Sequence, residues 1–199
     1  MLRAKDSSGE ISADSELFRF YLQGFSAGVA VTACLVSQRG EFQGESGSSD
    51  DLSWREDRAL VAALRRNSEI VLTTGKTARA EKLGMPKTAK LALISESRNL
   101  ENTRLDKANP DLLLLSGQDK SWKYFAMLRD YGFKNIQCEF GPGTMAESWN
   151  AGQIDLLCVS SLTADEPFDL GAKRQVFELE IGKGWVRGFV SGVATMGSL

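Results

Sequence analysis

The chain has 199 residues, of which 24 are basic and 26 acidic, and it contains no histidine. The absence of histidine excludes a Ser-His-Asp or Cys-His nucleophile and any metal site with histidine ligands. With a net charge of −2 we expect no nucleic-acid partner, because nucleic-acid binding usually requires a basic patch.

The three cysteines, Cys34, Cys138 and Cys158, lie far apart in apolar runs. This spacing predicts buried free thiols and neither a zinc site nor a disulfide framework, so no metal is expected. No apolar stretch approaches the ~20 residues that a membrane span needs. The first ten residues also lack the apolar core of a signal peptide. We therefore expect a cytoplasmic protein without a membrane partner.

A polar segment over residues 1–15 precedes a single domain, expected over residues 16–199. In chain order, the first half of this domain is predicted to form a short helix (17–25), a strand (29–36), a long Gly/Ser-rich loop (38–51) and a helix (53–67). A strand (70–74), a turn (75–77), a helix (77–83) and a strand (91–95) follow. Ser53 and Glu56 have the spacing of a capping box at the start of the longer helix, which buries Leu60, Val61 and Leu64. The helix over 77–83 is expected to end at Gly84.

The second half continues the alternation of strands and helices. We predict a strand (112–115), a helix (120–130), a strand (136–139), a helix that stops at Gly152 (144–151), a strand (156–160) and a hairpin (175–190). The first of these helices is amphipathic, with Trp122, Phe125, Ala126 and Arg129 at helical spacing, and its aromatic stripe is expected to face the core. Such alternation implies a largely parallel sheet covered on both faces, to which the hairpin adds antiparallel edge strands.

Two turns between a strand and a helix have the composition of phosphate-binding turns. The first, 73–77, contains Gly-Lys-Thr, but Ile70 stands where a P-loop needs its first glycine, so we reject that motif. The second, 141–146, has the form G-x-G-x-x-A, in which small residues and the free N–H groups of a helix N-terminus can accept a phosphate. A tight turn without a ligand is the alternative interpretation.

Several blocks of sequence, in the same order and at the same spacing, are shared with one known family. They are 37–40, the loop 38–51, 63–65, 70–81, 139–142 and 151–157. On these blocks the chain resembles the reductase domain of the bifunctional deaminase–reductase of riboflavin biosynthesis, which has the dihydrofolate-reductase-like fold. The resemblance implies a three-layer α/β/α domain with a mixed, mostly parallel sheet of about eight strands and a C-terminal antiparallel hairpin, usually as a homodimer.

The resemblance also implies a function. The family uses NADPH to reduce the ribosyl group of a phosphoribosylamino-pyrimidine, as in 5-amino-6-(5-phosphoribosylamino)uracil reductase. The positions that would meet NADPH are Thr74, Gly75, Thr77, Glu81, Ser95, Ser97, Arg98, Gly141, Pro142, Gly143 and Thr144. The positions that would meet the substrate are Ser37, Ser49, Arg65 and Glu139. A carboxylate at the end of an apolar strand needs a partner or becomes protonated, so Glu139 is also the candidate proton donor.

The chain departs from the family pattern in several places, among them two single positions. Arg39 replaces the acidic residue of S-x-D-G, and Phe140 replaces the first glycine of E-G-G-P. These differences leave a second hypothesis open, in which the same fold is a non-catalytic nucleotide-binding or interaction module. The reductase hypothesis requires the two glycine-containing turns to meet in space and to direct their amides at one diphosphate.

Overall fold

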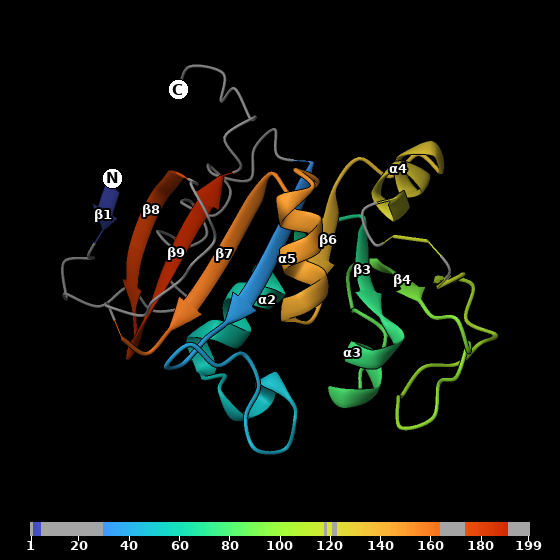
Figure 1. Ribbon diagram of the computed structural model, residues 1–199, viewed down its shortest axis with the longest axis horizontal. Helices are drawn as coiled ribbons and strands as arrows, with labels where there is room; N and C mark the ends of the chain where they lie inside the picture. The colour runs from blue at the N-terminus through green and yellow to red at the C-terminus, as the bar shows by residue number, and fades with distance from the viewer. Residues whose placement is uncertain (1, 5–29, 118, 121–122, 164–173, 191–199) are drawn as a thin grey trace.

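The computed structural model describes residues 2–4, 30–117, 119–120, 123–163 and 174–190, which form one sheet with helices against it (Figure 1). The strands are β1 (Leu2–Ala4), β2 (Val31–Val36), β3 (Ile70–Thr74), β4 (Lys90–Ile94), β5 (Leu112–Leu115), β6 (Ile136–Glu139), β7 (Leu156–Ser161), β8 (Arg174–Ile181) and β9 (Gly184–Val190). The helices are the 3-10 helix η1 (Ser49–Asp51), α2 (Arg55–Arg66), α3 (Gly75–Ala80), α4 (Lys123–Asp130) and α5 (Pro142–Asn150). The helix expected at 17–25 lies outside the described residues.

The nine described strands are ordered β1-β8-β9-β7-β2-β6-β3-β4-β5. Neighbouring strands are parallel except where β9 pairs with β7 and with β8. The expected mostly parallel sheet and its C-terminal antiparallel hairpin are therefore confirmed. The hairpin does not provide the edge strand, because β1, from the segment we expected only to precede the domain, pairs outside β8.

Alternating residues of the central strands bury opposite faces of the sheet, as the pleat requires. One face packs α4 and α5 through a core that includes Ala33, Leu72, Cys138, Phe125 and Trp149. The other face packs α2 on one side and α3 on the other, in two separate clusters. Figure 1 shows α5 in front of the sheet and α2 behind it. The two helical layers and the sheet make the expected three layers.

The start of α2 differs from the prediction. The helix begins at Arg55 with Trp54 as its N-cap, and no side chain caps it. Ser53 Oγ instead donates to the carbonyl of Ser49, 3.2 Å away, because η1 brings that carbonyl directly beneath it. The capping box is therefore wrong, although Leu60 and Leu64 are buried as expected and Val61 is half-buried.

The region around Gly75 is helix where we predicted a turn. Thr74 is the N-cap of α3, and its Oγ1 accepts the backbone N–H of Thr77 at 3.1 Å. The helix ends at Ala80, because Lys82 takes a positive φ of 46° and the N–H of Leu83 reaches back to the carbonyl of Ala78. Gly84 is therefore not the residue that ends this helix.

The boundaries of α4 and α5 also shift. Within α4 the buried side chains are Tyr124, Phe125 and Leu128, whereas Ala126 and Arg129 are exposed. The stripe that we predicted is therefore rotated by one position, and Trp122 lies outside the described residues. Helix α5 begins at Pro142 rather than at residue 144, since proline at the first helical position needs no acceptor for a backbone N–H.

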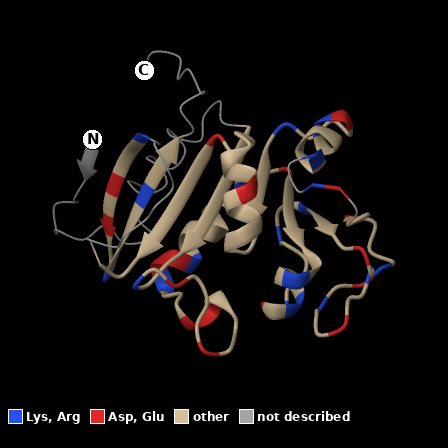
Figure 2. Ribbon diagram, viewed as in Figure 1, with Lys and Arg blue, Asp and Glu red and all other residues tan. Residues whose placement is uncertain are grey.

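Charge is sparse on the central strands and concentrated at their ends and in the loops (Figure 2). An exception is the pair on β8 and β9, where Arg187 Nε lies 3.1 Å from Glu178 Oε2 and both side chains are nearly buried. Among the described residues, no helix is long and apolar enough to cross a membrane, and no cluster of cysteines and carboxylates could hold a metal ion.

Candidate functional site

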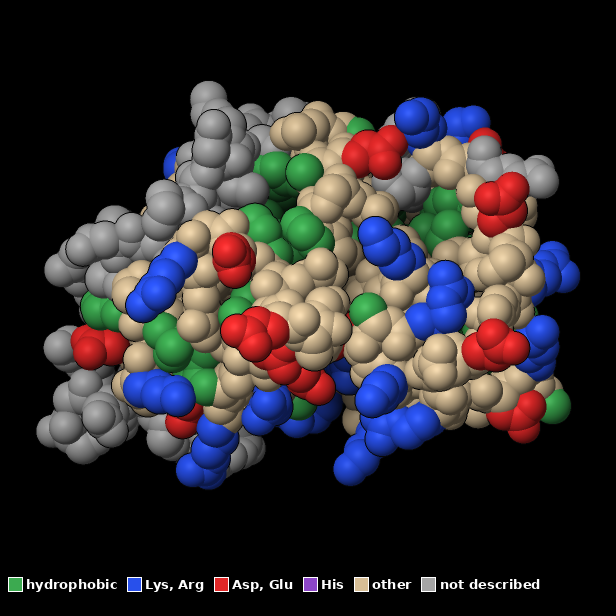
Figure 3. Space-filling model, turned by 60° about the horizontal axis from the view of Figure 1, so that its bottom comes forward, with side chains coloured by type: hydrophobic (Ala, Val, Ile, Leu, Met, Phe, Trp, Pro, Cys, Tyr) green, Lys and Arg blue, Asp and Glu red, His purple; other side chains and the backbone are tan. Residues whose placement is uncertain are grey.

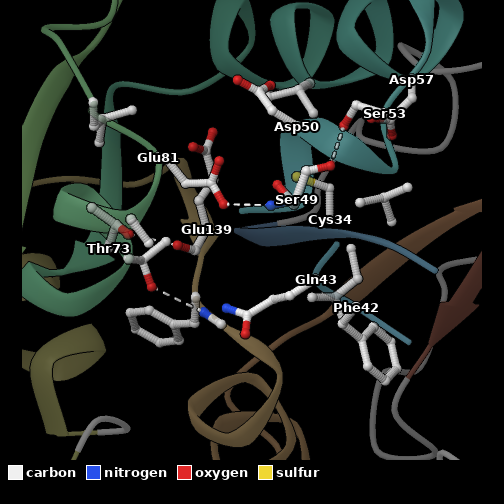
Figure 4. Close-up of a pocket in the computed structure, with 18 of the residues that line it drawn as sticks. Cys34, Phe42, Gln43, Ser49, Asp50, Ser53, Asp57, Thr73, Glu81 and Glu139 are labelled. Carbon is white, nitrogen blue, oxygen red and sulfur yellow. Dashed lines mark hydrogen bonds between the residues drawn. The ribbon is translucent and has the colours of Figure 1, made fainter. Parts of the chain in front are cut away.

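A cavity of about 390 Å³ lies where β2, β3 and β6 end, between α2, α3 and the loop after β2 (Figure 4). The ends of the three strands contribute Cys34, Val36, Thr73 and Glu139 to its wall. Because the three strands are parallel, their carboxyl ends meet at one edge of the sheet, where open α/β sheets bind their ligands.

Charges of both signs line the cavity. Its ionisable carboxylates and guanidiniums are Asp50, Asp57, Glu81, Glu139, Arg58, Arg65 and Arg104. Figure 3 shows the same mixture over the face from which the carboxyl ends emerge, without a large patch of one sign. Orientation of a ligand here therefore depends on individual contacts and not on a strong overall field.

Arg65 and Glu139 form a two-pronged ion pair in the cavity wall. Arg65 Nε donates to Glu139 Oε1 at 2.7 Å, and Arg65 Nη2 donates to Oε2 at 2.6 Å. The two side chains are 29% and 12% exposed. The hydrogen bonds that Arg65 donates to Glu139 raise the pKa of the Arg65 guanidinium, against the opposing effect of burial. Glu139 thus has the partner that its position demands.

The two glycine-containing turns meet, as expected. The N–H of Gly141 donates to Thr77 Oγ1 at 3.2 Å, and Thr77 Oγ1 also lies 2.9 Å from Thr74 Oγ1. A second link ties the strands behind the turns, since Thr73 Oγ1 donates to the carbonyl of Glu139 at 2.6 Å. The starts of α3 and α5 are therefore held side by side at the cavity.

The start of α5 presents backbone donors. Gly141 is the N-cap, and no side chain caps the helix. The amides of Gly143 and Thr144 belong to the first turn, in which N–H groups have no intrahelical acceptor. A Cβ on Gly143 would meet no atom within 4 Å, so the space beside its backbone is open. This turn can accept an anionic group at close range.

Glu81 fixes the long loop over the cavity. Its carboxylate accepts Ser48 Oγ at 2.5 Å and the backbone N–H of Ser49 at 2.8 Å. The loop is further braced where Gln38 and Glu41 exchange backbone hydrogen bonds and where Asp51 accepts the N–H of Ser46. The hydrogen bonds with Ser46 lower the pKa of Asp51. Phe42 and Gln43 from this braced loop reach the cavity (Figure 4).

The structure separates the predicted site residues into two groups. The cavity wall includes Ser49, Arg65, Thr77, Glu81, Glu139, Gly141 and Pro142. The others lie behind or beside it: Ser37, Thr74, Gly75, Ser95, Ser97, Arg98, Gly143 and Thr144. Ser37 is buried, and its N–H donates to the carbonyl of Ser160.

The residues expected near adenosine lie at the end of β4, on the far side of α3. Ser95 is buried against Gly75, because a Cβ added to Gly75 would lie 2.9 Å from Ser95 Oγ. Ser97 Oγ accepts the N–H of Asn99, and Arg98 is exposed with a φ of 50°. None of these side chains lines the cavity.

The sequence did not reveal several cavity residues, among them Cys34, Phe42, Asp57, Arg58 and Arg104. Asp57 is the least expected of these, because an acidic residue in the first turn of a helix ordinarily complements the helix dipole at the surface. It is instead only 4% exposed. Its burial follows from the packing of α2 against β7, for which the local sequence contains no signal.

The three thiols are reduced and remain inside the protein. Cys138 and Cys158 are buried and Cys34 is half-buried at the cavity. Burial raises the pKa of Cys158 to about 12 and raises the pKa values of Cys34 and Cys138 well above the ordinary thiol value. The predicted free thiols are confirmed.

Comparison with known proteins gives similarity at the level of structure. No protein-family model and no curated protein sequence matches the chain. A pyrimidine reductase-like protein from Corynebacterium diphtheriae superposes with a TM-score of 0.62 at 14% identity, over 90% of this chain and 98% of that one. The riboflavin biosynthesis reductase of Saccharomyces cerevisiae superposes with a TM-score of 0.58 at 11% identity, over 88% and 99%.

A third similar structure is the bifunctional diaminohydroxyphosphoribosylaminopyrimidine deaminase/5-amino-6-(5-phosphoribosylamino)uracil reductase of Thermotoga maritima. Its TM-score is 0.59 at 12% identity, and the match covers 86% of this chain and 59% of that protein. The chain thus has the fold of the pyrimidine reductases of riboflavin biosynthesis, the dihydrofolate-reductase-like fold that the sequence blocks implied. At these identities the similarity concerns the fold.

Proposed function

We propose that the chain is an NADPH-dependent reductase that delivers a hydride to a pyrimidine-linked ribose or a related small substrate. The observation that carries this proposal is the hydrogen bond between Gly141 and Thr77, which joins two glycine-containing turns beside a cavity lined by the Arg65–Glu139 pair. Three solved structures with this fold are named as reductases or reductase-like proteins, which supports the same reaction class.

The turn at the start of α5 fits the pyrophosphate of NADPH. Gly143 leaves the backbone open to close approach, and the amides of Gly143 and Thr144 are donors at a helix N-terminus. Pro142 sets the entry of the helix, and Gly141 and Thr77 hold it against α3. When bound, the nicotinamide would supply the hydride, and the protein supplies position and charge.

The remaining cofactor contacts extend along α3 and β4. We propose that Thr74 and Gly75 shape the cofactor groove and that Glu81 holds the loop that covers it. Beyond them, Ser95, Ser97 and Arg98 would meet the adenosine end, with the Arg98 guanidinium against the 2′-phosphate.

On the substrate side, Arg65 and Glu139 line the cavity together. Glu139, held in place by its two hydrogen bonds with Arg65, can accept hydrogen bonds from a pyrimidine or a ribose. The N–H of Ser49 donates to Glu81 in the cavity wall, and the N–H of Ser37 donates to the carbonyl of Ser160 just before the loop begins. Because its charge is already neutralised by Arg65, Glu139 is better suited to position the substrate than to donate a proton.

The proposal is tested by titrating the protein with NADPH and with NADH while following tryptophan emission. Buried Trp54 precedes α2 directly after the loop, and buried Trp149 lies on α5, so binding at either element is expected to quench emission. Saturable quenching by NADPH, followed by NADPH oxidation in the presence of 5-amino-6-(5-phosphoribosylamino)uracil, is expected. The absence of quenching by millimolar amounts of either nucleotide would contradict the proposal.

The non-catalytic alternative is distinguished by the same experiment. Arg39 is exposed and does not line the cavity, and Phe140 packs its ring edge against Phe125 with centroids 6.1 Å apart. Of the two departures from the family pattern, Phe140 contributes to the cavity wall and Arg39 does not. NADPH binding without turnover of any offered pyrimidine would favour the alternative. A homodimer and a cytoplasmic location remain part of the proposal.

A further inference from the structure

Asp57 is a carboxyl group buried in the cavity wall, and none of the ion pairs among the described residues includes it. It comes from the first turn of α2 and is 4% exposed. Figure 4 shows it beside Ser53, on the side of the cavity formed by α2. Within the described part of the chain, Arg65 is paired with Glu139, and Arg58 is exposed, with its Nε 3.9 Å from Asp50 Oδ1.

Two hydroxyls contact the Asp57 carboxyl, and each also reaches a backbone carbonyl. Ser160 Oγ, from β7, contacts Asp57 Oδ1 and lies 3.3 Å from the carbonyl of Leu35. Ser53 Oγ contacts the Asp57 side chain and lies 3.2 Å from the carbonyl of Ser49. A hydroxyl has one proton to donate and can accept as well.

The surroundings of Asp57 indicate the state of the carboxyl. If Asp57 carries a proton, it can donate to Ser160 Oγ while Ser160 Oγ donates to the carbonyl of Leu35. If Asp57 is ionised, its buried charge has at most the two neutral hydroxyls as donors and belongs to no ion pair among the described residues. Burial also raises the pKa of Asp57, an effect that the two serines and Arg58 only partly oppose.

The groups around Asp57 come from several elements. Arg58, on the same helix, and Asp50, on η1, act on it directly and with opposite sign. Cys34 of β2 interacts electrostatically with Asp57 and also with the Arg65–Glu139 pair. Since Arg65 and Glu139 neutralise each other, no net positive charge from that pair favours ionisation of Asp57.

The carboxylic acid Asp57 is therefore distinct from the other carboxylates of the cavity. Glu139 is ion-paired, Glu81 accepts two donors, and Asp50 is exposed. With no histidine in the chain, a reduction in this cavity needs its proton from another group. We propose that Asp57 is the catalytic proton donor of the reductase reaction.

The step, which rests on the proposed function, balances as follows. A hydride from the reduced nicotinamide adds to the electrophilic carbon of a C=N or C=O bond of the substrate, and NADPH becomes NADP⁺. The π electron pair of that bond moves onto nitrogen or oxygen, which takes the proton from Asp57. Asp57 is left as a carboxylate, and water entering through the cavity mouth returns the proton.

The first test measures the protonation state without any reaction. At about pH 6, above the ordinary pKa values of Asp and Glu, the wild-type protein is expected to show the infrared C=O stretch of a protonated carboxyl. The band is expected to shift in D₂O and to be absent from Asp57→Asn, while Asp130→Asn, at an exposed position at the end of α4, retains it. A wild-type protein without this band, or an Asp57→Asn protein that keeps it, overturns the proposal whether or not the chain is a reductase.

The second test measures turnover of NADPH with 5-amino-6-(5-phosphoribosylamino)uracil. Asp57→Asn is expected to bind NADPH as the wild type does but to oxidise it at least about 100-fold more slowly. The wild-type rate is expected to fall as pH rises through the pKa of Asp57, and this dependence is expected to vanish in Asp57→Asn. A variant with the wild-type rate overturns the proposal.

The two tests separate the two hypotheses. A wild-type protein that shows the protonated band but oxidises no NADPH contradicts the proposed function and leaves the protonated Asp57 standing. If Asp57→Asn does not fold, the pH dependence of the wild-type rate decides alone. A rate that is constant or rises from pH 5 to pH 8 would then rule out a carboxylic acid as the proton donor.

Discussion

Thr77 and Gly141 are joined by a hydrogen bond across 64 residues of chain, and this contact sets the distance between the starts of α3 and α5. The acceptor is a side-chain hydroxyl, so it can be removed without changing either backbone. This makes the proposed cofactor groove accessible to a simple substitution.

We expect Thr77→Val to weaken NADPH binding by about 10-fold and to destabilise the fold by about 1 kcal/mol, because the Gly141 N–H loses its acceptor. Thr77→Ser keeps the hydroxyl and is expected to bind as the wild type does. Both affinities can be measured by tryptophan quenching. Equal affinity of the two variants would show that the contact does not shape the groove.

The Arg65–Glu139 pair is expected to contribute to stability. Removal of one partner leaves a largely desolvated charge, so Arg65→Ala or Glu139→Gln should cost about 1–3 kcal/mol, less than a fully buried pair because Arg65 is partly exposed. Urea denaturation of the two single variants and the double variant gives the coupling energy. Arg58→Ala, which breaks the exposed 3.9 Å pair with Asp50, is the matched control and is expected to change stability by less than about 0.5 kcal/mol.

The raised pKa of Asp57 predicts how the stability of the fold depends on pH. Its pKa is raised in the folded state, so its contribution to stability is fully present below the unfolded pKa and is lost as pH rises through the folded pKa. Asp57→Asn has no carboxyl group at this position and does not lose stability in this way. We therefore expect the Tm of the variant to increase relative to the wild type as pH rises from about 4 through the raised pKa. A constant difference in Tm over this range would contradict the assignment.

The thiols are expected to resist labelling in the folded protein. Each unit by which a thiol pKa is raised lowers the thiolate fraction about tenfold. Cys158, with a pKa of about 12, therefore has roughly 1000-fold less thiolate at pH 8 than a thiol with the ordinary pKa of 9.0. A chromogenic disulfide reagent should react slowly with the native chain. In guanidinium chloride, where the chain is unfolded, it should react with all three cysteines. Rapid reaction of one thiol in the native state would identify Cys34, the residue at the cavity.

Arg98 tests the orientation of the proposed cofactor. If its guanidinium meets the 2′-phosphate, Arg98→Ala should reduce the preference for NADPH over NADH about 10-fold and leave NADH affinity unchanged. Lys107→Ala, at an exposed cation on the same connection after β4 that does not line the cavity, is the comparison. An unchanged preference in Arg98→Ala would remove this residue from the binding site.

The sequence was sufficient for features that depend on local pattern and order. The strands 70–74 and 156–160 are runs rich in apolar and β-branched residues, and Gly152, with a φ of 68°, ends α5 as expected. Glu139 and Arg65, both predicted to meet the substrate, proved to contact each other. That pairing follows from the adjacency of α2 to the end of β6.

Features that depend on packing between distant segments were not predictable. Ser53 missed its capping role because η1 supplies a competing carbonyl, and Lys82 ends α3 although glycine is the residue expected there. Asp57 gave no sign of burial, since its contact with Ser160 joins positions 103 residues apart. Such contacts depend on the order of the strands, which no local window contains.

The position of β2 in the sheet has a consequence for the synthesis of the protein. Both neighbours of β2, β6 and β7, are more than 100 residues further along the chain, as the 105-residue separation of Thr32 and Gln137 shows. At about 5–20 residues per second on the ribosome, the apolar segment 31–36 waits roughly 5–20 s before either partner strand has been made. During that interval its backbone groups and apolar side chains have no native partner in the sheet. We therefore expect the yield of folded protein in cells to depend on chaperone capacity and translation speed more than on the melting temperature of the finished molecule.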